Sequence, residues 1–340
     1  MWKITAQRWS SDQKDSKIFL NAFVLTSMSD SNSPSFDDQF PVANVFVPGS
    51  LGEAGDDAPT VVLPMQLVNL DDAGRTDVGR QRNHNEDQFF IRTDTLRHEG
   101  PQGRNLKAQG LYILCDGMGG HACGEVASAK TVQFLRNFFK ERWTDQQLPN
   151  EQTIREAILA ANAEIYHANL ENESYGSGRM GTTLVMLLVQ DTNVAIAHVG
   201  DSRVYRYTRK NHLEQLTLDH ELGQVEILRG VDPDIAYSMP DAYQLTQAIG
   251  PRDNEFVYPD IRFLEVQEDT LFLLCSDGLS DNELLDEYQE THVQPLLSSR
   301  TNIETGVIEL IDLANEYNGH DNITVIAVRL KVKPNMSLLP

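Results

Sequence analysis

One segment of the chain joins an apolar run to a carboxylate and a group of glycines. Leu111 to Cys115 is apolar, and it is followed at once by Asp116 and by three glycines within four residues, of which Gly117 is the first. An Asp-Gly pair alone is usually a turn. Here the glycines also let the backbone turn sharply, which can bring the Gly117 carbonyl oxygen close to whatever Asp116 binds. The segment predicts a platform of oxygen ligands at a strand end.

The same construction recurs three times. Carboxylates stand at the ends of three more apolar runs: Asp277 after Leu271–Ser276, Asp321 before Ile323–Val328, and Glu86 with Asp87 before Gln88–Ile91. Anions at this density repel one another unless cations are present. Because the ligands on offer are carboxylates and carbonyls, Mg or Mn is favoured over Zn, and Ca is also compatible. We therefore expect a site for divalent metal.

A positive group for an anionic substrate lies close by in the sequence. Arg82 precedes Glu86 by four residues, and a guanidinium can grip phosphate through two parallel hydrogen bonds. Arg80 is a weaker candidate for the same task. A simpler interpretation is that both arginines neutralise neighbouring acids at the surface, and the sequence leaves these two interpretations open.

Short strands and two amphipathic helices have to position these residues. Helices are expected over Glu125–Trp143 and Glu151–Leu170, where apolar side chains recur at helical spacing, and both should cover a sheet. Strands are expected over seven runs: Gln88–Ile91, Leu111–Cys115, Thr183–Val189, Val194–His198, Val204–Tyr207, Leu271–Ser276 and Ile323–Leu330. The three middle runs are joined by short turns, which predicts antiparallel pairing rather than a doubly wound parallel sheet.

The chain divides into an extension, one domain and a short tail. Residues 1–64 are polar and rich in turn-forming residues, so we expect a partly disordered extension, in which Ile18–Leu25 could be a strand or a short helix. From Met65 the alternation of apolar runs and amphipathic segments continues to about Val332. This predicts one domain over residues 65–332 and a C-terminal tail over residues 333–340.

Charge and composition narrow the classes of partner. The chain has 50 acidic and 28 basic residues, a formal net charge of -22, which argues against nucleic acid and anionic membranes as partners. Its apolar runs are much shorter than the roughly 18 residues of a membrane-spanning helix, and we expect no span. Because Cys115, Cys123 and Cys275 do not have the spacing of a zinc site or a disulfide framework, we expect a cytoplasmic protein.

Seven motifs occur in the order found in a known family. They are Thr76-Asp-Val-Gly-Arg with Asn85-Glu-Asp, Asp116-Gly-Met-Gly-Gly-His, Met180-Gly-Thr-Thr, Gly200-Asp-Ser-Arg, Leu216-Thr-Leu-Asp-His, Ser276-Asp-Gly-Leu and Asp321-Asn-Ile-Thr. From Thr76 to Leu330 the chain therefore resembles the metal-dependent serine/threonine protein phosphatases of type 2C, in their bacterial form. The resemblance implies an α+β fold, in which two antiparallel β-sheets pack as a sandwich with α-helices on the outer faces. It also makes residues 65–332 the catalytic domain.

The resemblance implies an activity and a role for each site residue. The activity is hydrolysis of phosphoserine and phosphothreonine in phosphorylated protein substrates, in bacterial signalling, with a cognate serine/threonine kinase as a partner. Two ions of Mn or Mg are implied, and water that they activate attacks phosphorus in line. By analogy the Asp116 carboxylate lies between the two ions. The Gly117 carbonyl, Glu86 and Asp87 belong to one ion, and Asp277 and Asp321 belong to the other. Arg82 binds the phosphate.

Some expectations are less determined by the resemblance. His121 is a candidate acid for the leaving oxygen, or it has a structural or substrate-contacting role; some family members have a histidine at the position of Met118. A third ion is left open, because Glu173 is the nearest acid before Met180. Residues 221–247 are expected to form a mobile flap, and the Gly200–Arg203 turn is expected to be architectural.

Two other functions stay open at this point. One is a catalytically silent module that recognises phosphorylated partners, although such proteins usually lose the metal acids that are all present here. The other is an enzyme for a non-protein phosphate ester or for one dedicated regulatory protein. Neither the substrate nor the purpose of residues 1–64 can be identified from the sequence.

Overall fold

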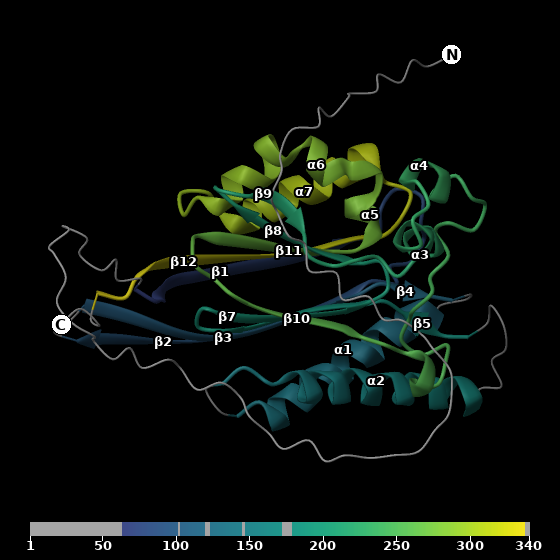
Figure 1. Ribbon diagram of the computed structural model, residues 1–340, viewed down its shortest axis with the longest axis horizontal. Coiled ribbons are helices and arrows are strands. Elements are labelled where there is room, and N and C mark those ends of the chain that lie inside the picture. Colours follow the sequence, from purple (N-terminus) through teal and green to yellow (C-terminus); the bar gives the residue numbers. More distant parts are fainter. Residues whose placement is uncertain (1–62, 101–102, 120–122, 145–146, 172–178, 337–340) are drawn as a thin grey trace, which may run out of the picture. The chain divides into compact units, whose positions relative to one another are not determined.

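Two five-stranded sheets, antiparallel throughout, dominate the described part of the chain (Figure 1). The computed structural model describes residues 63–100, 103–119, 123–144, 147–171 and 179–336. Across the first sheet the strands are β1 (Met65–Asp77), β12 (Ile323–Pro334), β11 (Thr270–Cys275), β8 (Arg203–Thr208) and β9 (His212–Gln215). Across the second they are β10 (Asp260–Glu265), β7 (Asn193–Val199), β6 (Leu184–Gln190), β3 (Gly103–Cys115) and β2 (Gln88–Gly100). Strands β4 (Gly117–Met118) and β5 (Gly181–Thr182) form a separate pair.

The two large sheets face each other across a shared apolar layer. Val185 and Leu187 of β6 point into this layer, together with Phe272 of β11 from the other sheet. Leu184 and Met186 belong to a different cluster on the opposite face of β6, because successive side chains of a strand point to opposite sides. The layer makes the fold a sandwich of antiparallel sheets, as the sequence predicts.

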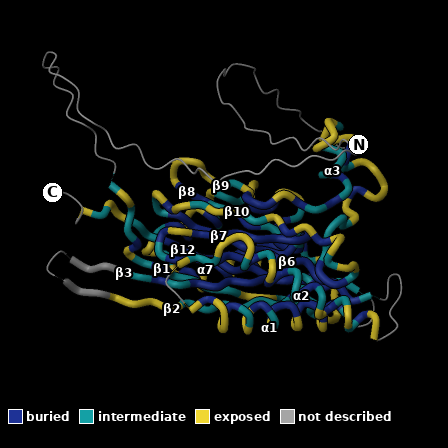
Figure 2. The backbone as a smooth tube through the Cα atoms, turned by 60° about the horizontal axis from the view of Figure 1, so that its bottom comes forward, coloured by how far each residue is buried: buried dark blue, intermediate teal, exposed yellow. Residues whose placement is uncertain are grey.

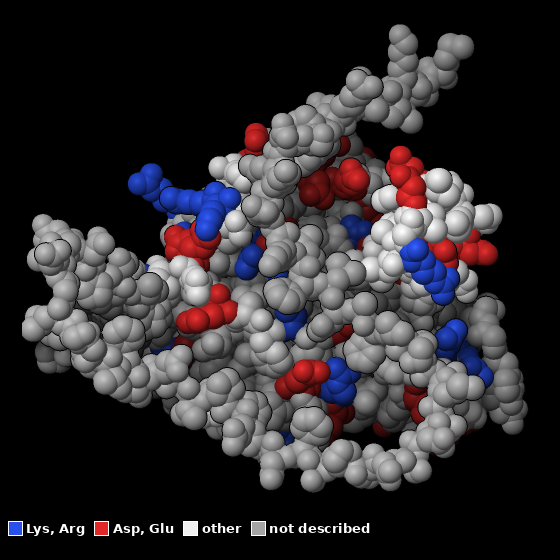
Figure 3. Space-filling view, in the orientation of Figure 1, with Lys and Arg blue, Asp and Glu red and all other residues white. Residues whose placement is uncertain are grey.

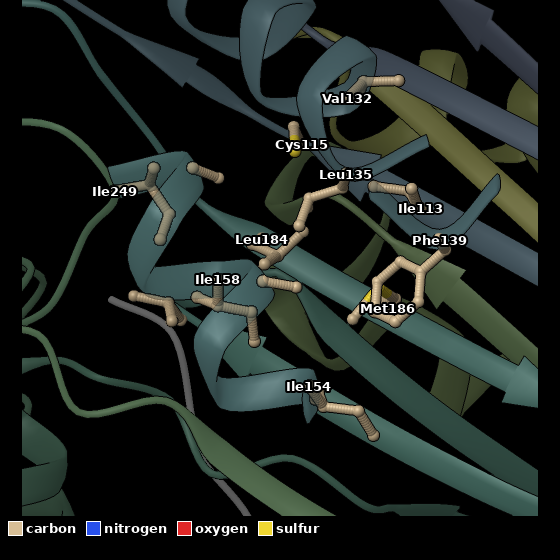
Figure 4. Close-up of a cluster of buried hydrophobic side chains, with 14 of the residues drawn as sticks. Ile113, Cys115, Val132, Leu135, Phe139, Ile154, Ile158, Leu184, Met186 and Ile249 are labelled. Carbon is tan, nitrogen blue, oxygen red and sulfur yellow. The ribbon is translucent and has the colours of Figure 1, made fainter. Parts of the chain in front are cut away.

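Helices α1 (Cys123–Arg142) and α2 (Glu151–Glu171) cover the outer face of the second sheet (Figures 1 and 4). Leu135 and Phe139 of α1 and Ile158 of α2 pack with Leu184 and Met186 of β6 in one buried cluster. Each apolar side chain buried in this way contributes about 1.5–3 kcal/mol of transfer free energy. Both predicted helices are confirmed, and both cover a sheet.

Further helices lie along the chain after β9. They are α3 (Leu222–Leu228), α4 (Pro233–Ala236), α5 (Asp277–Ser280), α6 (Leu284–Glu287) and α7 (Ile303–Tyr317), with the short helical segments η2 (Asn254–Phe256), η3 (Asp281–Glu283), η4 (Gln289–Val293) and η5 (Gln294–Leu297). Val307 and Leu310 of α7 pack with Leu273 of β11 on the outer face of the first sheet. A layer of helices thus lies on each outer face of the sandwich, as Figure 1 shows, while Figure 2 shows the buried strands between them.

Strands β1, β9 and β10 and helix α7 lie outside the predicted runs. β1 has 13 residues, of which only Leu67 and Leu70 are fully buried. It is an edge strand that pairs with β12 alone, so it does not show the continuous apolar run of a central strand. Asp71, in the middle of β1, forms an ion pair with the buried Arg329 of β12, in which Arg329 Nη2 lies 2.8 Å from Asp71 Oδ2.

The register of the second sheet brings two predicted acids together. Gln88 of β2 pairs with Cys115 of β3 at the end of their ladder. Asp87 and Asp116 are the next residues beyond this pair, one on each strand. They therefore lie side by side although 29 positions separate them in the sequence.

The first sheet contributes acids at the same end of the sandwich. Cys275 of β11 pairs with Arg203 of β8 on one side and with Val325 of β12 on the other. Asp277 follows β11 by two residues, and Asp321 precedes β12 by two residues. Antiparallel pairing therefore places both carboxylates beyond the same end of these three strands.

Basic and acidic side chains both occur on the face of the molecule drawn in Figure 3. On the face of the molecule in Figure 3, Lys and Arg side chains lie scattered among acidic ones. Within the described ranges, no helix has both the length and the apolar composition to cross a membrane. The predicted extension lies outside the described residues except for Leu63 and Pro64, and so does its run Ile18–Leu25.

Candidate metal centre

A pocket with a volume of about 270 Å³ opens where the strand ends meet. Six of the predicted site residues line it: Arg82, Glu86, Asp116, Gly117, Asp277 and Asp321. Asp87 is buried, with 1% of its surface exposed, and it lies beside Asp116. His121 lies outside the described residues. The fold thus brings together all the predicted acids, which come from four separate parts of the chain.

The backbone around Asp116 is fixed by two threonines of the neighbouring strand region. The Asp116 amide donates to Thr183 Oγ1 at 3.0 Å, and the Asp116 carbonyl accepts from the Thr183 amide at 2.8 Å and from Thr182 Oγ1 at 2.7 Å. These bonds occupy the peptide groups of Asp116. Its carboxylate is therefore left to face the pocket.

Gly117 lies where no side chain fits. A Cβ atom at Gly117 would lie 2.3 Å from the Gly124 carbonyl oxygen and 2.6 Å from the Glu86 carbonyl oxygen. The start of α1 therefore packs directly on the backbone that follows Asp116. The same segment holds Glu86, because Ser128 of α1 donates to the Glu86 carbonyl at 2.5 Å. Close packing between backbones therefore explains why residue 117 is a glycine.

Asn322 fastens the loop that carries Glu86. Its Oδ1 accepts from the Glu86 amide at 2.8 Å, and its Nδ2 donates to the carbonyls of Val78 and His84 at 2.9 Å each. Asn322 is 5% exposed, so it acts as a buried brace rather than a ligand. Asn322 belongs to the Asp321-Asn-Ile-Thr motif, but the local sequence does not indicate this role.

Asp87 is held from the opposite sheet. Ser276, the residue before Asp277, donates its hydroxyl to Asp87 Oδ2 at 2.8 Å, and the Thr324 amide donates to Ser276 Oγ at 2.9 Å. Ser276 thereby ties β11 and β12 to the start of β2. This link across the sandwich sets the distance between Asp87 and Asp277.

The carboxylates of the pocket are electrostatically strained. Burial raises the pKa of Asp116 well above its ordinary value, and the charges of Asp87 and Asp277 raise it further. Burial likewise raises the pKa of Asp277, with added repulsion from Asp201 and Asp281, and raises the pKa of Asp87 to about 6. In each case the charged form is the one that the surroundings disfavour.

Two carboxylate oxygens at this centre also lack a partner. Asp87 Oδ1 and Asp277 Oδ1 are buried without a hydrogen bond in the described part of the chain. A bound divalent cation would coordinate such oxygens and would reverse the repulsion among the carboxylates. The donor set consists of carboxylate and carbonyl oxygen, which suits Mg or Mn. The residues present therefore fit a metal centre.

Arg82 lies at the rim of the pocket and pairs with one of its acids. Its Nη2 lies 2.6 Å from Asp321 Oδ2, and half of the Arg82 side chain is exposed. Burial lowers the pKa of the guanidinium, but the charge of Asp321 and the hydrogen bond to it outweigh this and raise that pKa overall. A cation at this rim can reach a ligand that enters the pocket. Arg80, the weaker candidate, is not among the lining residues.

Asp201 also lines the pocket, although the sequence indicates only a turn there. Asp201 lies two residues before Arg203, and Arg203 pairs with Cys275 of β11. Asp201 therefore lies next to the segment that follows β11 and begins at Asp277. A smaller adjoining pocket of about 160 Å³ is lined by Asp201, Asp277 and Asp281. Burial raises the pKa of Asp201 to about 6. The acidic surface is thus wider than the predicted set.

Arg203 and Gly200 tie the turn to the residues that follow β9. Arg203 donates to Asp219 Oδ2 from Nη2 at 2.6 Å and from Nε at 2.9 Å, and Nε also donates to Asp219 Oδ1 at 3.1 Å. The amide of His220 donates to the Gly200 carbonyl at 3.0 Å. These bonds fix the turn that carries Asp201 against the start of the expected flap.

His198, His220 and Asp260 form a separate cluster that could hold a metal by distance alone. Its hydrogen bonds argue against this use. The Gly200 amide donates to His220 Nδ1 at 3.1 Å, so the proton of a neutral His220 is on Nε2, which lies 3.0 Å from Asp260 Oδ2. That nitrogen has no free lone pair for a cation. The cluster instead braces the Gly200 turn.

The expected flap segment borders the pocket. Residues 221–247 include α3 and α4, and Leu245 lines the acidic pocket. Tyr237 donates its hydroxyl to Glu221 Oε2 at 2.9 Å, and its ring lies where a side chain on Gly223 would clash. These contacts hold the middle of the segment against its own first residues.

Comparison with known proteins gives a consistent result. A family model described as protein phosphatase 2C matches residues 89–311. The chain is 37% identical over 261 residues to the serine/threonine phosphatase stp of Listeria monocytogenes, covering 75% of this chain and 93% of that protein.

Solved structures are similar over the same part of the chain. The serine/threonine phosphatase PstP/Ppp of Mycobacterium tuberculosis has a TM-score of 0.60 at 30% identity, covering 77% of this chain and 99% of that chain. A PstP catalytic domain in complex with two manganese ions has a TM-score of 0.58 at 28% identity, covering 78% of this chain and 99% of that chain.

Proposed function

The chain belongs to the protein phosphatase 2C family, and from this premise we propose that its acidic pocket holds two divalent cations for the hydrolysis of phosphoserine and phosphothreonine. The protein is a metal-dependent serine/threonine phosphatase, as its relatives are. The finer assignment concerns which residues hold the ions and the phosphate. We assign Asp116 and the Gly117 carbonyl, with Glu86, Asp87, Asp277 and Asp321, to the metals, and Arg82 to the substrate.

One observation carries this assignment. Carboxylates from four parts of the chain converge on one pocket, and two of their buried oxygens have no partner among the described residues. Burial and neighbouring charges raise the pKa values of Asp116 and Asp277 among them. Such an arrangement is unfavourable for the protein alone and favourable for a protein that binds cations. Bound ions of this kind supply activated water and offset the charge of a phosphoryl group.

The chain's own residues complete the chemistry. Arg82 has a donor fork that suits two oxygens of a phosphate, and on substrate binding we expect it to exchange its bond with Asp321 for bonds with the phosphate. Asn322 and Ser276 keep Glu86 and Asp87 in place. His121 stays our candidate for giving a proton to the leaving oxygen.

We propose Mn or Mg as the metal and two ions per chain, supported by the pair of manganese ions in the related PstP structure. A third ion would find carboxylates in the adjoining pocket beside Asp277. We further propose phosphorylated proteins of the cytoplasm as substrates and a cognate serine/threonine kinase as the opposing enzyme. The names of the relatives support the substrate class.

The test is phosphate release from phosphoserine and phosphothreonine peptides, measured with MnCl₂ and after removal of metal with a chelator. We expect turnover with Mn, none after chelation, and recovery when Mn is added back. Failure to release phosphate from any such peptide under all three conditions would overturn the proposed activity. A silent module that only recognises phosphorylated partners would show binding without release.

A further inference from the structure

A second pocket opens next to the acidic pocket and shares part of its wall. It has a volume of about 290 Å³, and Met118 and Leu245 line both pockets. Ala248, Pro251 and Phe256 are its other apolar wall residues, and we call it the flank pocket. Because a polypeptide advances only about 3.3 Å per residue when extended, a residue next to one held in the acidic pocket lies near the flank pocket.

The two pockets differ in chemistry. Five carboxylates line the acidic pocket, whereas none of the residues that line the flank pocket is acidic and Arg252 is its one charged residue. Phe256 is 54% exposed at its wall. The other lining residues, Gln244, Thr246 and Gln247, are uncharged, so the wall carries no carboxylate although the chain has a net charge of -22. It suits an apolar side chain and disfavours a cation.

Buried asparagines hold this wall in place. Asn162 of α2, which is fully buried, donates to the Arg252 carbonyl at 3.0 Å and to Asn254 Oδ1 at 2.8 Å, and it accepts from the Gly250 amide at 2.6 Å. Asn169 of the same helix donates to the Gly250 carbonyl at 3.1 Å. The loop before η2 is therefore preorganised, which lowers the entropic cost of binding.

The flank pocket is built on the same short strands as the metal centre. Thr182 of β5 exchanges two backbone hydrogen bonds with Ile249, at 3.0 and 2.8 Å, and β5 pairs with Gly117 and Met118 of β4. A Cβ atom on Gly181 would lie 2.8 Å from Pro251 and 3.0 Å from Met118, so these two side chains flank a glycine. The distance between the two pockets is thus set by backbone pairing.

We propose that the flank pocket binds an apolar side chain next to the phosphorylated serine or threonine of a protein substrate, an inference that rests on the proposed function. Phe256, Pro251 and Ala248 are the residues that determine this preference. A small phosphate ester has no neighbouring residue and cannot use the pocket. The pocket therefore gives the enzyme selectivity among phosphoproteins without taking part in the chemistry.

The test uses pairs of phosphothreonine peptides that differ at one position. Each pair carries leucine or asparagine at one of the three positions before or after the phosphothreonine, and kcat/KM for Mn-dependent phosphate release is measured. We expect the leucine peptide to be favoured by about tenfold at one or more positions, because leucine buries more apolar surface against Ala248, Pro251 and Phe256 than asparagine does. Lysine at that position should be disfavoured further.

Three variants separate the flank pocket from the rest of the surface. Phe256→Ala removes part of the wall and Ala248→Leu fills the pocket, so both should lower the preference for leucine to about twofold or less. Phe263→Ala is the matched control, since Phe263 is 45% exposed on β10 and lines neither pocket. It should keep the full preference. Thermal unfolding of each variant confirms that it is folded.

The outcomes distinguish the two proposals. Equal rates for leucine and asparagine peptides at every position, or a preference that survives in both Phe256→Ala and Ala248→Leu, overturn the flank pocket while leaving the phosphatase assignment intact. Absence of phosphate release from every peptide, with release from p-nitrophenyl phosphate, overturns protein substrates and the flank pocket together. Loss of release from both kinds of substrate contradicts the proposed function itself.

Discussion

Asp277 is a residue at which several carboxylates repel one another. Asp201, Asp281 and Asp321 all raise the pKa of its carboxyl group, after burial itself. Its Oδ1 has no hydrogen-bond partner in the described structure. The same side chain should therefore be unfavourable in the metal-free protein and necessary in the metal-loaded one.

Asp277→Asn separates these two effects. Hydrolysis of a phosphopeptide with Mn should fall by at least about a thousandfold, because one metal ligand is lost. The metal-free variant should be at least as stable as the metal-free wild type, because one buried charge is removed. Steady-state kinetics and thermal unfolding with and without Mn measure the two quantities. Undiminished turnover would show that our site assignment is wrong.

Glu221 should make the stability of the fold depend on pH, and this contribution can be measured separately. Burial raises the pKa of its carboxyl group to about 7, from an ordinary value of 4.5. A carboxyl whose pKa is raised on folding contributes stability that is complete below the unfolded-state pKa and is lost as the pH rises through the folded-state pKa. Glu221 should therefore weaken the fold progressively between about pH 4.5 and pH 7.

The comparison with Glu221→Gln isolates this contribution. The glutamine can still accept the hydrogen bond from Tyr237, but it does not ionise. Between pH 5 and pH 8 we expect the wild type to lose on the order of 1 to 2 kcal/mol relative to the variant, after allowance for solvent screening at the pocket wall. Urea unfolding at several pH values measures the difference. A difference that is constant across this range would contradict the assignment.

At the scale of elements, the start of α1 is what holds the Gly117 carbonyl. A Cβ atom on Gly124 would lie 2.8 Å from the Gly117 carbonyl oxygen and 2.8 Å from the Glu86 carboxyl carbon. The helix thus makes one close contact with two of the groups that we assign to the metals. Any displacement of α1 moves two groups that we assign to the same ion.

Gly124→Ala should consequently weaken metal binding from outside the ligand set. The added methyl pushes Gly117 and Glu86 apart, and we expect the concentration of Mn needed for half-maximal activity to rise by about tenfold or more. Val126→Ala, on the exposed side of the same turn, is the control and should leave this concentration unchanged. The measurement is the activity of both variants and of the wild type over a Mn titration. Equal Mn requirements in both variants would refute the role of this contact.

How well a strand can be predicted from the sequence depends on how deeply the strand is buried. β6 and β11 are buried along their whole length, so their sequences are continuous apolar runs that predict strands directly. β1 shows no such run, because it borders a single neighbour. Helix α7 does carry a signal, since Asn302 caps it and its buried residues recur at helical spacing, yet it was not among the predicted helices.

At the scale of the whole molecule, the site depends on which strands pair. The ligand motifs could be found because each carries an acid at a strand end. Asp201 could not be assigned in this way. Its place beside Asp277 follows from the pairing of β8 with β11. Which strands pair across a sheet is not visible in the local sequence. The brace formed by Asn322 is hidden for the same reason.

The described part of the chain contains all the residues that we assign to the metals. It begins just before β1, and the sandwich is closed by strands that all lie after residue 64. We therefore propose that residues 1–62 are dispensable for hydrolysis. A chain that starts at Leu63 should hydrolyse p-nitrophenyl phosphate within about twofold of the full-length rate. If that activity is lost although the truncated chain is folded, the proposed domain division is wrong.

The most direct test of the central claim is the position of manganese, located by anomalous diffraction in crystals grown with MnCl₂. We predict two anomalous peaks in the acidic pocket, with the Asp116 carboxylate bound to both ions and Asp277 and Asp321 on one of them. An additional peak beside Asp201 and Asp281 would settle the number of ions. No peak in this pocket, or peaks that Asp116 does not contact, would contradict the account.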